Sequence, residues 1–400
     1  MNLHVTYVAR NFWPDISGAA RVTSELAKGL AERGHRLSLF LPNSQYEHMV
    51  ANAEMRSILD RRFSVHHFGP RLSRLLGETV SFFFLLFRVI PAGFQSHVIL
   101  AHYHHSNLCA FCAAIASLVT QRPLVVRADD VVAKPSNIAQ TIILLIFRLF
   151  TRWCFRRASS VLVPGDELVE LAKRMHGGKN ATVGVSYNGV DTKRFRRENR
   201  NHFLRQTLGS KHIVIFSGEL TALDGIEVLV QAAVLLKEHV PDLMVLVIGD
   251  GPERGRLMRL ADSLGLGDSV RFLGAIGPDL VPEYLASSDV AVGPLKASHQ
   301  TFGATPLKVV EYLASGCVVV TGRGTVSNHL VIDNVNGLLF KSGHAADVAR
   351  TVLRVFSDKE LAKRLRRNAR KTVEEFYDWN IVVSELEVNL RSVVARSHRE

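Results

Sequence analysis

The sequence lacks the features that mark several classes of protein. Its 400 residues hold only four cysteines, too few for a scaffold held by disulfides. Its most apolar runs, VSFFFLLF and TIILLIF, fall short of the roughly 18 residues that a membrane-spanning helix needs. The first residues, MNLHVTYVA, have the pattern of a strand and no basic start or cleavage site of a secretory signal. We therefore expect a cytoplasmic protein that is not integral to a membrane.

A bound metal is also not expected. Cys109 and Cys112 form a CxxC pair with His102, His104 and His105 upstream, which makes zinc the alternative to consider. The surrounding segment, NLCAFCAAIASLV, is apolar like a buried helix, and the sequence has no second CxxC. The two cysteines are therefore interpreted as small core residues.

What the sequence has in excess is positive charge. The formal net charge is +12, from 49 Lys and Arg against 37 Asp and Glu. Such a balance favours anionic partners: nucleic acid, phosphorylated small molecules or an acidic lipid surface. Nucleic acid is not expected, because no helix-turn-helix, zinc finger or aromatic RNA-binding signature is visible. A hydrophobic content of 47% is enough for sizeable cores, and the length favours two or three domains.

Part of this charge lies on a predicted helix. Arg148, Arg152 and Arg156 recur every four residues and so form one stripe. The apolar TIILLIF stands beside them, which favours contact with an anionic bilayer at the inner face of a membrane. Two further clusters have the pattern of solvated faces. They are Lys193, Arg194, Arg196, Arg197 and Arg200, and Lys363, Arg364, Arg366, Arg367, Arg370 and Lys371.

Apolar runs alternate with helical patterns along the whole chain. The predicted strands of the first half are LHVTYVA, HRLSLFLP, HVILAHYH, PLVVRADD and SSVLVPG; those of the second half are HIVIFSGEL, LMVLVIGDG, SVRFLGA, VAVGPL, CVVVTG and NGLLF. Alternation of this kind is typical of a parallel sheet covered on both faces. It pauses at YNGVDTKRF. The sequence therefore predicts an α/β protein of two doubly wound, Rossmann-like domains joined near residue 190.

We place the first domain at residues 1–190 and the second at 191–377. The last segment, YDWNIVVSELEVNLRSVVARS, has the pattern of one amphipathic helix with no strand after it. Residues 378–400 are therefore expected to pack back on the first domain. Ligands of open α/β sheets bind beyond the carboxyl ends of the strands, so both domains are expected to aim loops into a central cleft.

Four motifs carry a family likeness: FWPDISGAARVTSELAKGLAERGHRLSLF, YNGVDTKRF, VIGDGPERGRLMRLADSLGLGDSVRFLG and TPLKVVEYLASGCVVVTG. In their order and spacing they resemble the GT-B glycosyltransferases of the retaining group called family 4, over nearly the whole chain. The resemblance implies a GT-B fold, with an acceptor-binding first domain and a donor-binding second domain. It further implies transfer of a sugar from a nucleotide-sugar donor to a lipid-linked or polysaccharide acceptor, with retention and with no metal or other cofactor.

The resemblance also assigns roles to single residues. Glu311 would accept hydrogen bonds from the ribose hydroxyls of the donor, and Lys308 would add a cation for the diphosphate. The helix that follows TFGATPLK would turn backbone N–H groups toward the same phosphates. Gly18 and Gly218 stand in loops where the backbone would approach the donor. The alternatives are a solvated helix position for Lys308 and Glu311, and a tight turn for Gly18.

Four residues depart from the family pattern. Glu219 and Asp224 stand where the family commonly has Arg and Lys, and Gly303 stands where the first Glu of a Glu-x7-Glu pattern would fall. Asp129 replaces a His and is the candidate catalytic group of the first domain, with a turn cap as the alternative. Because carboxylates repel a diphosphate, we expect either that Glu219 and Asp224 point away from it or that the donor loop is reshaped.

Two readings of these departures stay open. The favoured one is an active glycosyltransferase that takes its cations from elsewhere, with Arg127 and Arg323 as possible phosphate contacts. The other is a non-catalytic homologue with the same fold that acts as a binding or scaffold protein.

Overall fold

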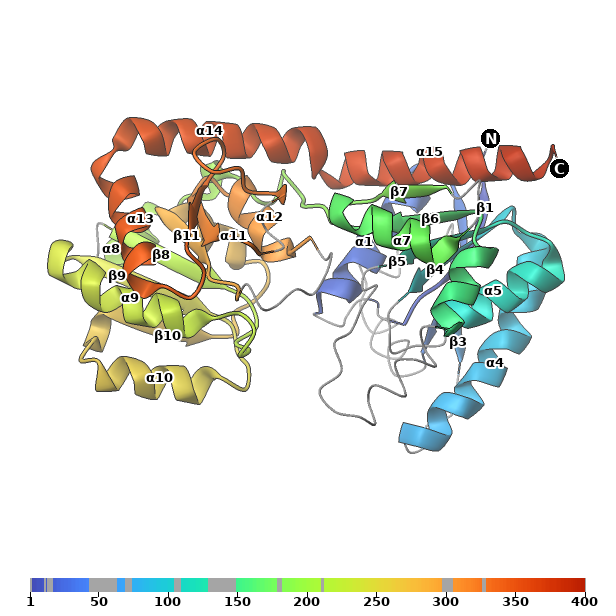
Figure 1. Ribbon diagram of the computed structural model, residues 1–400, viewed down its shortest axis with the longest axis horizontal. Coiled ribbons are helices and arrows are strands. Elements are labelled where there is room, and N and C mark those ends of the chain that lie inside the picture. The colour runs from blue at the N-terminus through green and yellow to red at the C-terminus, as the bar shows by residue number, and fades with distance from the viewer. Residues whose placement is uncertain are drawn as a thin grey trace. The chain divides into compact units, whose positions relative to one another are not determined.

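The computed structural model describes residues 2–10, 12, 17–42, 63–68, 74–103, 109–128, 149–177, 182–209, 212–296, 305–325 and 329–399 (Figure 1). The chain forms two compact units, Met1–Asn188 with Trp379–Glu400, and Gly189–Gln300 with Thr305–Asp378. The units join at Asn188–Gly189, next to the joint placed near residue 190 from the sequence. No helix in the described ranges is long and apolar enough to cross a bilayer.

The first unit is built on a parallel sheet. Its described strands lie in the order β3-β2-β1-β4-β5-β6-β7, so the chain starts at β1, winds out to β3 and returns past β1 to β4. Strands β4, β5 and β6 are buried along their whole length, as parallel strands between two helical layers must be. The strands are His4–Val8 (β1), Arg36–Pro42 (β2), Phe63–Phe68 (β3), Val98–Tyr103 (β4), Leu124–Ala128 (β5), Ser160–Val163 (β6) and Val183–Val185 (β7).

Helices cover this sheet, and helix α1 shows how the sequence pattern produces their packing. Val22, Leu26 and Leu30 recur on one face and are all buried. Ser17 caps the amino terminus of α1, because its hydroxyl accepts a hydrogen bond from the N–H of Ala20 at 3.3 Å. The described helices of the first unit are Gly18–Glu32 (α1), Arg74–Gln95 (α4), Cys109–Thr120 (α5), 149–157, Asp166–Leu168 (the 3-10 turn η1), Val169–His176 (α7) and Trp379–Ser397 (α15).

The last helix, α15, packs against α1 within the first unit. The two helices approach most closely at Gly29, where an added Cβ would lie 2.5 Å from Cγ2 of Val383. Beside this contact Arg33 forms an ion pair of 3.3 Å with Glu387. The buried ring of His35 lies 3.2 Å from the same carboxylate; burial lowers the pKa of His35, and Glu387 opposes that shift.

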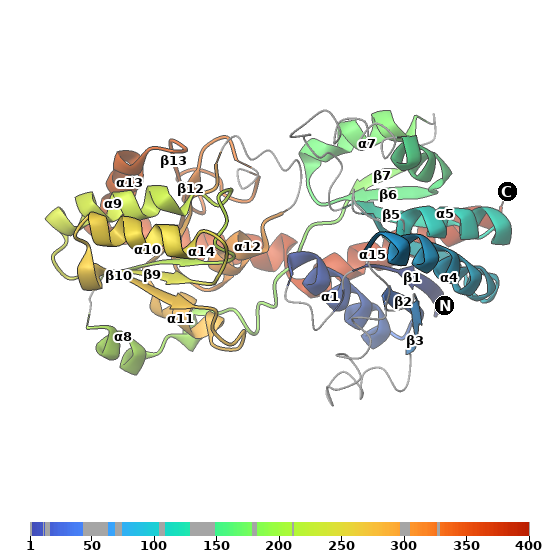
Figure 2. The same ribbon diagram turned by 90° about the horizontal axis from the view of Figure 1, so that it is seen from below.

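The second unit repeats the architecture. Its strand order, β10-β9-β8-β11-β12-β13, is that of a Rossmann sheet, with β8 first in the chain and central. Figure 2 shows α9 and α10 on one face of this sheet and α11 on the other. The strands are His212–Ser217 (β8), Leu243–Ile248 (β9), Val270–Gly274 (β10), Val290–Gly293 (β11), Val318–Gly322 (β12) and Leu338–Phe340 (β13). The predicted α/β class, with two doubly wound sheets, is confirmed.

The helices of the second unit connect and flank these strands. They are Arg197–Asn199 (the 3-10 turn η2), His202–Leu208 (α8), Ile226–His239 (α9), Arg254–Ser263 (α10), Gly267–Ser269 (the 3-10 turn η3), Val281–Ser287 (α11), Leu307–Ala314 (α12), Ala345–Ser357 (α13) and Lys359–Phe376 (α14). Helix α12 follows the loop after β11, and its eight residues carry several of the candidate site residues.

Replacing Gly29 by Leu is expected to destabilise the first unit. The added side chain collides with Val383, and overpacking of this kind costs about 1–3 kcal/mol. Urea unfolding followed by circular dichroism should show a lower midpoint. A second replacement, Val383→Ala, makes room and should restore part of the loss, whereas Val388→Ala, at an exposed position of α15, should not. Unchanged stability of Gly29→Leu would contradict the close contact.

Candidate active site at the carboxyl edge of the second sheet

The site lies where the winding of the second sheet changes direction. Strands β8 and β11 are neighbours and parallel, and the chain leaves them in opposite directions along the sheet. Loops that follow such a pair of strands separate from each other and leave room for a ligand. The loop after β8 is Gly218–Gly225, and the loop after β11 leads to α12.

Glycines allow the loop after β8 to lie directly on its neighbours. The N–H of Gly218 donates to the carbonyl oxygen of Ile248 at 3.0 Å. A Cβ at Gly249 would lie 1.8 Å from the carbonyl oxygen of Gly218, and one at Gly225 would lie 2.3 Å from that of Pro294. Gly249 and Gly225 also have positive φ, of 128° and 66°, which glycine adopts without strain. The loop is therefore fixed by backbone contacts.

Asp224 and Lys308 form an ion pair across this edge. Asp224 is buried, and its second carboxylate oxygen accepts a hydrogen bond of 2.7 Å from the hydroxyl of Thr221. The ammonium of Lys308 also lies 4.9 Å from the centre of the Phe216 ring, a favourable cation–π distance. It fits there because residue 218 is glycine; a Cβ at Gly218 would lie 2.9 Å from Nζ of Lys308. The acid at 224 is thus neutralised by the lysine of α12.

The other two acids of this edge differ from Asp224. The side chain of Glu219 is exposed, and no ion pair is found for it within the described ranges. Asp250 shapes the loop after β9: its carboxylate accepts from the N–H of Gly251 at 2.8 Å, and its carbonyl oxygen accepts from the N–H of Leu220 at 2.9 Å.

Helix α12 holds Lys308 and Glu311 one turn apart. Glu311 is 7% exposed and Tyr312 is fully buried, so the alternative of a solvated helix position is wrong for Glu311. Tyr312 was not recognised as a site residue. Its hydroxyl donates to the carbonyl oxygen of Ser217 and accepts from the N–H of Ser217, both at 2.8 Å. Burial raises the pKa of Tyr312 well above its usual value, so the hydroxyl keeps its proton and anchors α12 to the end of β8.

The two arginines named as possible phosphate contacts already have protein partners. Arg127, in β5 of the first unit, is fully buried. Its Nη2 donates to the carbonyl oxygen of Ser186 at 3.1 Å and to Oδ1 of Asn188 at 2.6 Å. A structural role, joining β5 to the end of the first unit, therefore replaces the expected phosphate contact. Arg323 follows β12 at the carboxyl edge, where its guanidinium donates to Asp333 at 2.9 Å.

The remaining candidates of the first unit are only partly described. Gly18 is the first residue of α1 and is exposed, at the end of the loop that follows β1. Asp129, the candidate catalytic residue, lies outside the described residues, as do Gly303 and Arg148. Arg152 and Arg156 are described and are exposed.

The cysteines considered for zinc lie in the hydrophobic core of the first unit. Burial raises the pKa of Cys109 to about 12 and also raises that of Cys112, so both keep their protons at neutral pH. His102 instead bonds the hydroxyl of Tyr7 at 2.7 Å. No group of three or more metal-ligating side chains occurs among the residues that the structure describes.

Two family models match the chain: Glycosyltransferase Family 4 over residues 16–194 and Glycosyl transferases group 1 over residues 198–372. N-acetyl-alpha-D-glucosaminyl L-malate synthase of Bacillus anthracis is 24% identical over 384 residues, 94% of each chain. D-inositol 3-phosphate glycosyltransferase of Thermomonospora curvata is 27% identical over 390 residues, 89% of this chain and 86% of its own. Among solved structures, HepE of Anabaena in complex with UDP has a TM-score of 0.75 at 21% identity, covering 98% of this chain and all of that chain (100%).

These comparisons agree with one another and with the sheet topology. The likeness to HepE over the whole chain confirms the predicted GT-B fold, and the two family models match the two units in turn. Nothing in them favours the non-catalytic alternative. The chain belongs to the group 1 glycosyltransferases, family 4, and it is an enzyme that transfers a sugar.

Proposed function

We propose that the enzyme transfers a sugar from a nucleoside-diphosphate sugar to a lipid-linked or polysaccharide acceptor, and that the donor binds at the carboxyl edge of the second sheet. One observation carries the proposal: Lys308 and Glu311 leave the same helix, α12, beside the glycine loop at the point where strand winding changes. Such a point is the usual ligand position of an open α/β sheet. HepE, a structural neighbour, was crystallised with UDP and with UDP-glucose.

Lys308 is the proposed cation for the donor diphosphate. An ammonium has three N–H donors, and the ion pair with Asp224 leaves others for a ligand. Asp224 then acts as a positioning residue: it holds a flexible side chain in place before the donor arrives, and preorganised charge stabilises a leaving group better than mobile charge. The amino-terminal N–H groups of α12 add partial positive charge beside it.

Glu311 is the proposed ribose contact. Its carboxylate can accept hydrogen bonds from two hydroxyls, and its low exposure strengthens such bonds by excluding water. Retention of the anomeric configuration and independence of a metal are proposed from the family alone. In that scheme Lys308 and the N–H groups of α12 stabilise the negative charge of the leaving diphosphate. In other transferases a metal ion stabilises this charge.

Replacing Lys308 by Met is expected to weaken binding of a nucleoside diphosphate at least tenfold, since a hydrogen bond to a charged group contributes about 1.5–3 kcal/mol. Calorimetry with UDP, GDP and ADP measures this loss. Binding of the matching nucleoside, which has no phosphate, should stay unchanged. Lys237→Met removes an exposed lysine of α9 and serves as the control. Equal diphosphate affinity in Lys308→Met and the control would remove Lys308 from the donor site.

The replacement Glu311→Ala tests the ribose contact, as Lys308→Met tests the phosphate contact. If Glu311 binds the ribose, nucleoside and nucleoside diphosphate should both bind more weakly, by about 1 kcal/mol or more. Calorimetry on the same ligands separates the two roles, because Lys308→Met affects only the phosphorylated ligand. A Glu311→Ala variant that binds the nucleoside as well as the unmodified enzyme does would refute the ribose contact.

We further propose that the first unit binds an anionic membrane surface, where a lipid-linked acceptor is found. Helix α4 exposes an aromatic face: Phe83, Phe84, Phe87 and Phe94 are 55%, 51%, 76% and 55% exposed. They recur at helical spacing, with Arg88 exposed between them. Exposed aromatic side chains beside cations are typical of helices that lie in a membrane interface.

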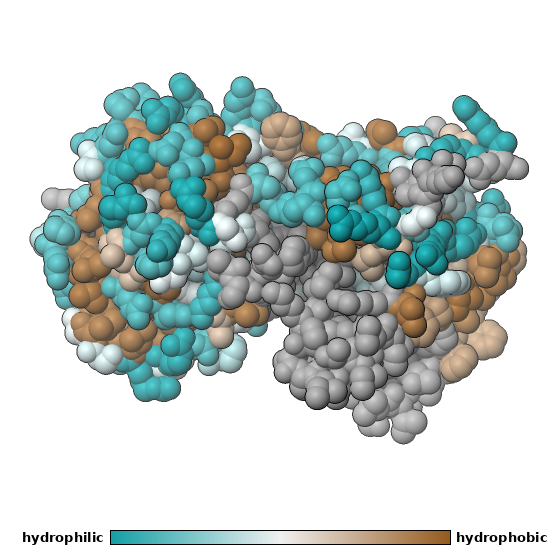
Figure 3. Space-filling view, viewed as in Figure 1, coloured by the Kyte–Doolittle hydropathy of each residue, from teal (hydrophilic) through white to brown (hydrophobic). Residues whose placement is uncertain are grey.

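Two neighbouring helices extend this aromatic face. Helix α4 packs on α5, and Phe111 of α5 contacts Phe150 and Trp153 of the 149–157 helix, with ring centres 4.9 and 5.1 Å apart. That helix also exposes Arg152 and Arg156, the described part of the predicted basic stripe. Figure 3 shows hydrophobic side chains at the surface over α4 and α5.

Replacing Phe84 and Phe87 by Ser is expected to reduce binding to vesicles that contain anionic lipid, because two exposed aromatic side chains are lost from the interface. Co-sedimentation measures the bound fraction. Arg152→Gln with Arg156→Gln should also reduce binding, and only this electrostatic part should weaken further with salt. Phe203→Ser, at an exposed site in the second unit, is the control. Unchanged vesicle binding in both test variants would end the proposal.

A further inference from the structure

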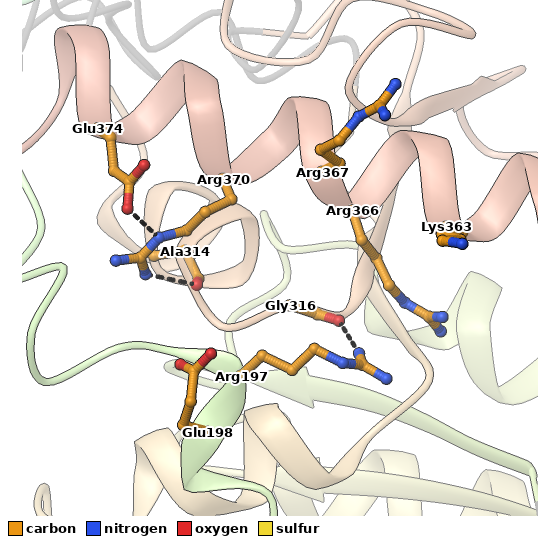
Figure 4. Close-up of a pocket in the computed structure, with 9 residues that line it drawn as sticks. All are labelled: Arg197, Glu198, Ala314, Gly316, Lys363, Arg366, Arg367, Arg370 and Glu374. Atoms are coloured by element: carbon orange, nitrogen blue, oxygen red, sulfur yellow. Dashed lines mark hydrogen bonds and ion pairs between the residues drawn. The ribbon is translucent and has the colours of Figure 1, made fainter.

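A pocket of about 490 Å³ lies in the second unit between α14, the carboxyl end of α12 and the turn η2. Figure 4 shows Arg197, Arg366 and Arg370 extending into the space between these elements, whereas Arg367 points away from it. The cations that line it outnumber the carboxylates, so it carries a strong positive potential. The cations are Arg197, Lys363, Arg366, Arg367 and Arg370, and the carboxylates are Glu198 and Glu374.

Two of these arginines build the wall of the pocket. Arg370 pairs with Glu374, with Nε and Oε1 2.6 Å apart, and its Nη1 donates to the carbonyl oxygen of Ala314 at 3.2 Å. Arg197 donates to the carbonyl oxygen of Gly316 at 2.6 Å. Gly316 has a φ of 80°, and a Cβ there would lie 2.7 Å from Cβ of Arg197. The absence of a side chain at Gly316 therefore leaves room for the side chain of Arg197.

The other three cations keep unused donors. Lys363 and Arg367 are exposed and form no ion pair or hydrogen bond among the described residues. Nη2 of Arg366 donates to the carbonyl oxygen of Asp289 at 3.2 Å, but its buried Nε has no acceptor there. Burial and then the charge of Arg197 lower the pKa of Arg366. Arg197 and Arg366 therefore repel each other.

The charge of Asp289 opposes this shift in the pKa of Arg366 only in part. Asp289 pairs with Arg205, with Oδ2 of Asp289 and Nη1 of Arg205 3.1 Å apart. Its carboxylate also accepts a hydrogen bond from the N–H of Ile213 at 3.0 Å. A buried donor without an acceptor is unfavourable, and neighbouring charges of one sign add to that cost. An anion in the pocket would offset the repulsion between the cations.

We propose that this pocket binds a phosphate mono- or diester that also carries hydroxyl groups. Guanidinium groups match phosphate oxygens in pairs, and Figure 4 shows Lys363 and Arg366 toward one end of the pocket and Glu198 and Glu374 toward the other. Carboxylates accept hydrogen bonds from hydroxyls. The volume lies in the range of small-molecule sites, roughly 300–1,000 Å³, and exceeds that of one phosphate. The ester comes either from a soluble sugar or polyol phosphate or from a phospholipid headgroup.

This pocket is separate from the proposed donor site. Lys308 and Glu311 belong to the first two turns of α12, whereas Ala314 and Gly316 mark its carboxyl end. None of the nine residues that line the pocket is a candidate donor contact. Binding at the two places is therefore distinguishable by mutation.

The test uses glycerol 3-phosphate as the soluble probe and phosphatidylglycerol in phosphatidylcholine vesicles as the lipid probe. Calorimetry measures the first and co-sedimentation the second. The double variant Lys363→Gln with Arg367→Gln removes two exposed cations that have no protein partner in the described residues, so folding is not at risk. We expect saturable binding by the full chain and a loss of at least tenfold in affinity in this variant.

Matched variants fix the interpretation. Arg364→Gln with Lys371→Gln removes the same charge from exposed positions of α14 outside the pocket, and Lys308→Met removes the proposed donor cation; both should leave binding of glycerol 3-phosphate intact. A further outcome is that the unmodified chain binds vesicles but not glycerol 3-phosphate. If the pocket variant then loses vesicle binding selectively, the result supports the phosphate site and assigns it to a lipid headgroup. Binding of neither probe, or equal weakening in the α14 control, overturns the proposal.

Discussion

Tyr312 joins α12 to the central strand of the second unit, and the charged groups at that edge depend on this contact. Its hydroxyl both donates to and accepts from the backbone of Ser217, the last residue of β8. Lys308 lies four residues earlier, so it leaves α12 on the same face. That face points at the end of β8, and the ammonium therefore reaches Phe216 and Asp224. A phenol with no charge at neutral pH thus positions the cation.

The ion pair of Asp224 with Lys308 keeps a cation at this edge of the sheet, although residue 224 is itself an acid. The family resemblance implies a cation at position 224, and here a cation arrives from α12, 84 residues further along the chain. The pair weakens the field that Lys308 alone would produce, but it also holds the ammonium beside the glycine loop. Since the carboxylate of Asp224 is also bonded by Thr221, the lysine has one well-defined partner and keeps donors for a ligand.

Much of this architecture could be predicted from the sequence, because strands and helices leave local periodic signals. The apolar runs became parallel strands, and the helical spacing of Val22, Leu26 and Leu30 produced the buried face of α1. The partners of polar residues could not be predicted in this way. Arg127 was interpreted as a phosphate contact, yet its partners Ser186 and Asn188 lie about sixty residues away in sequence and bury it.

The basic clusters also show that a local sequence pattern does not predict which distant residues will meet. Each was interpreted as a solvated face, since a run of charges on one predicted helix usually is. The fold brings Arg197 of the first cluster to Lys363, Arg366 and Arg370 of the second, and only this long-range meeting produces a pocket. Tyr312 is a similar case, because nothing in TPLKVVEYLASG distinguishes a tyrosine that packs from one that bonds a strand end.

Helix α12 connects the two charged sites of the second unit. It has eight residues and is therefore roughly 12 Å long. Its amino-terminal end carries partial positive charge and supports Lys308, whereas the carbonyl groups at its other end carry partial negative charge. Arg370 and Arg197 bond carbonyls there, at Ala314 and just past the helix at Gly316. The cations of the pocket thus stabilise the helix that positions Lys308.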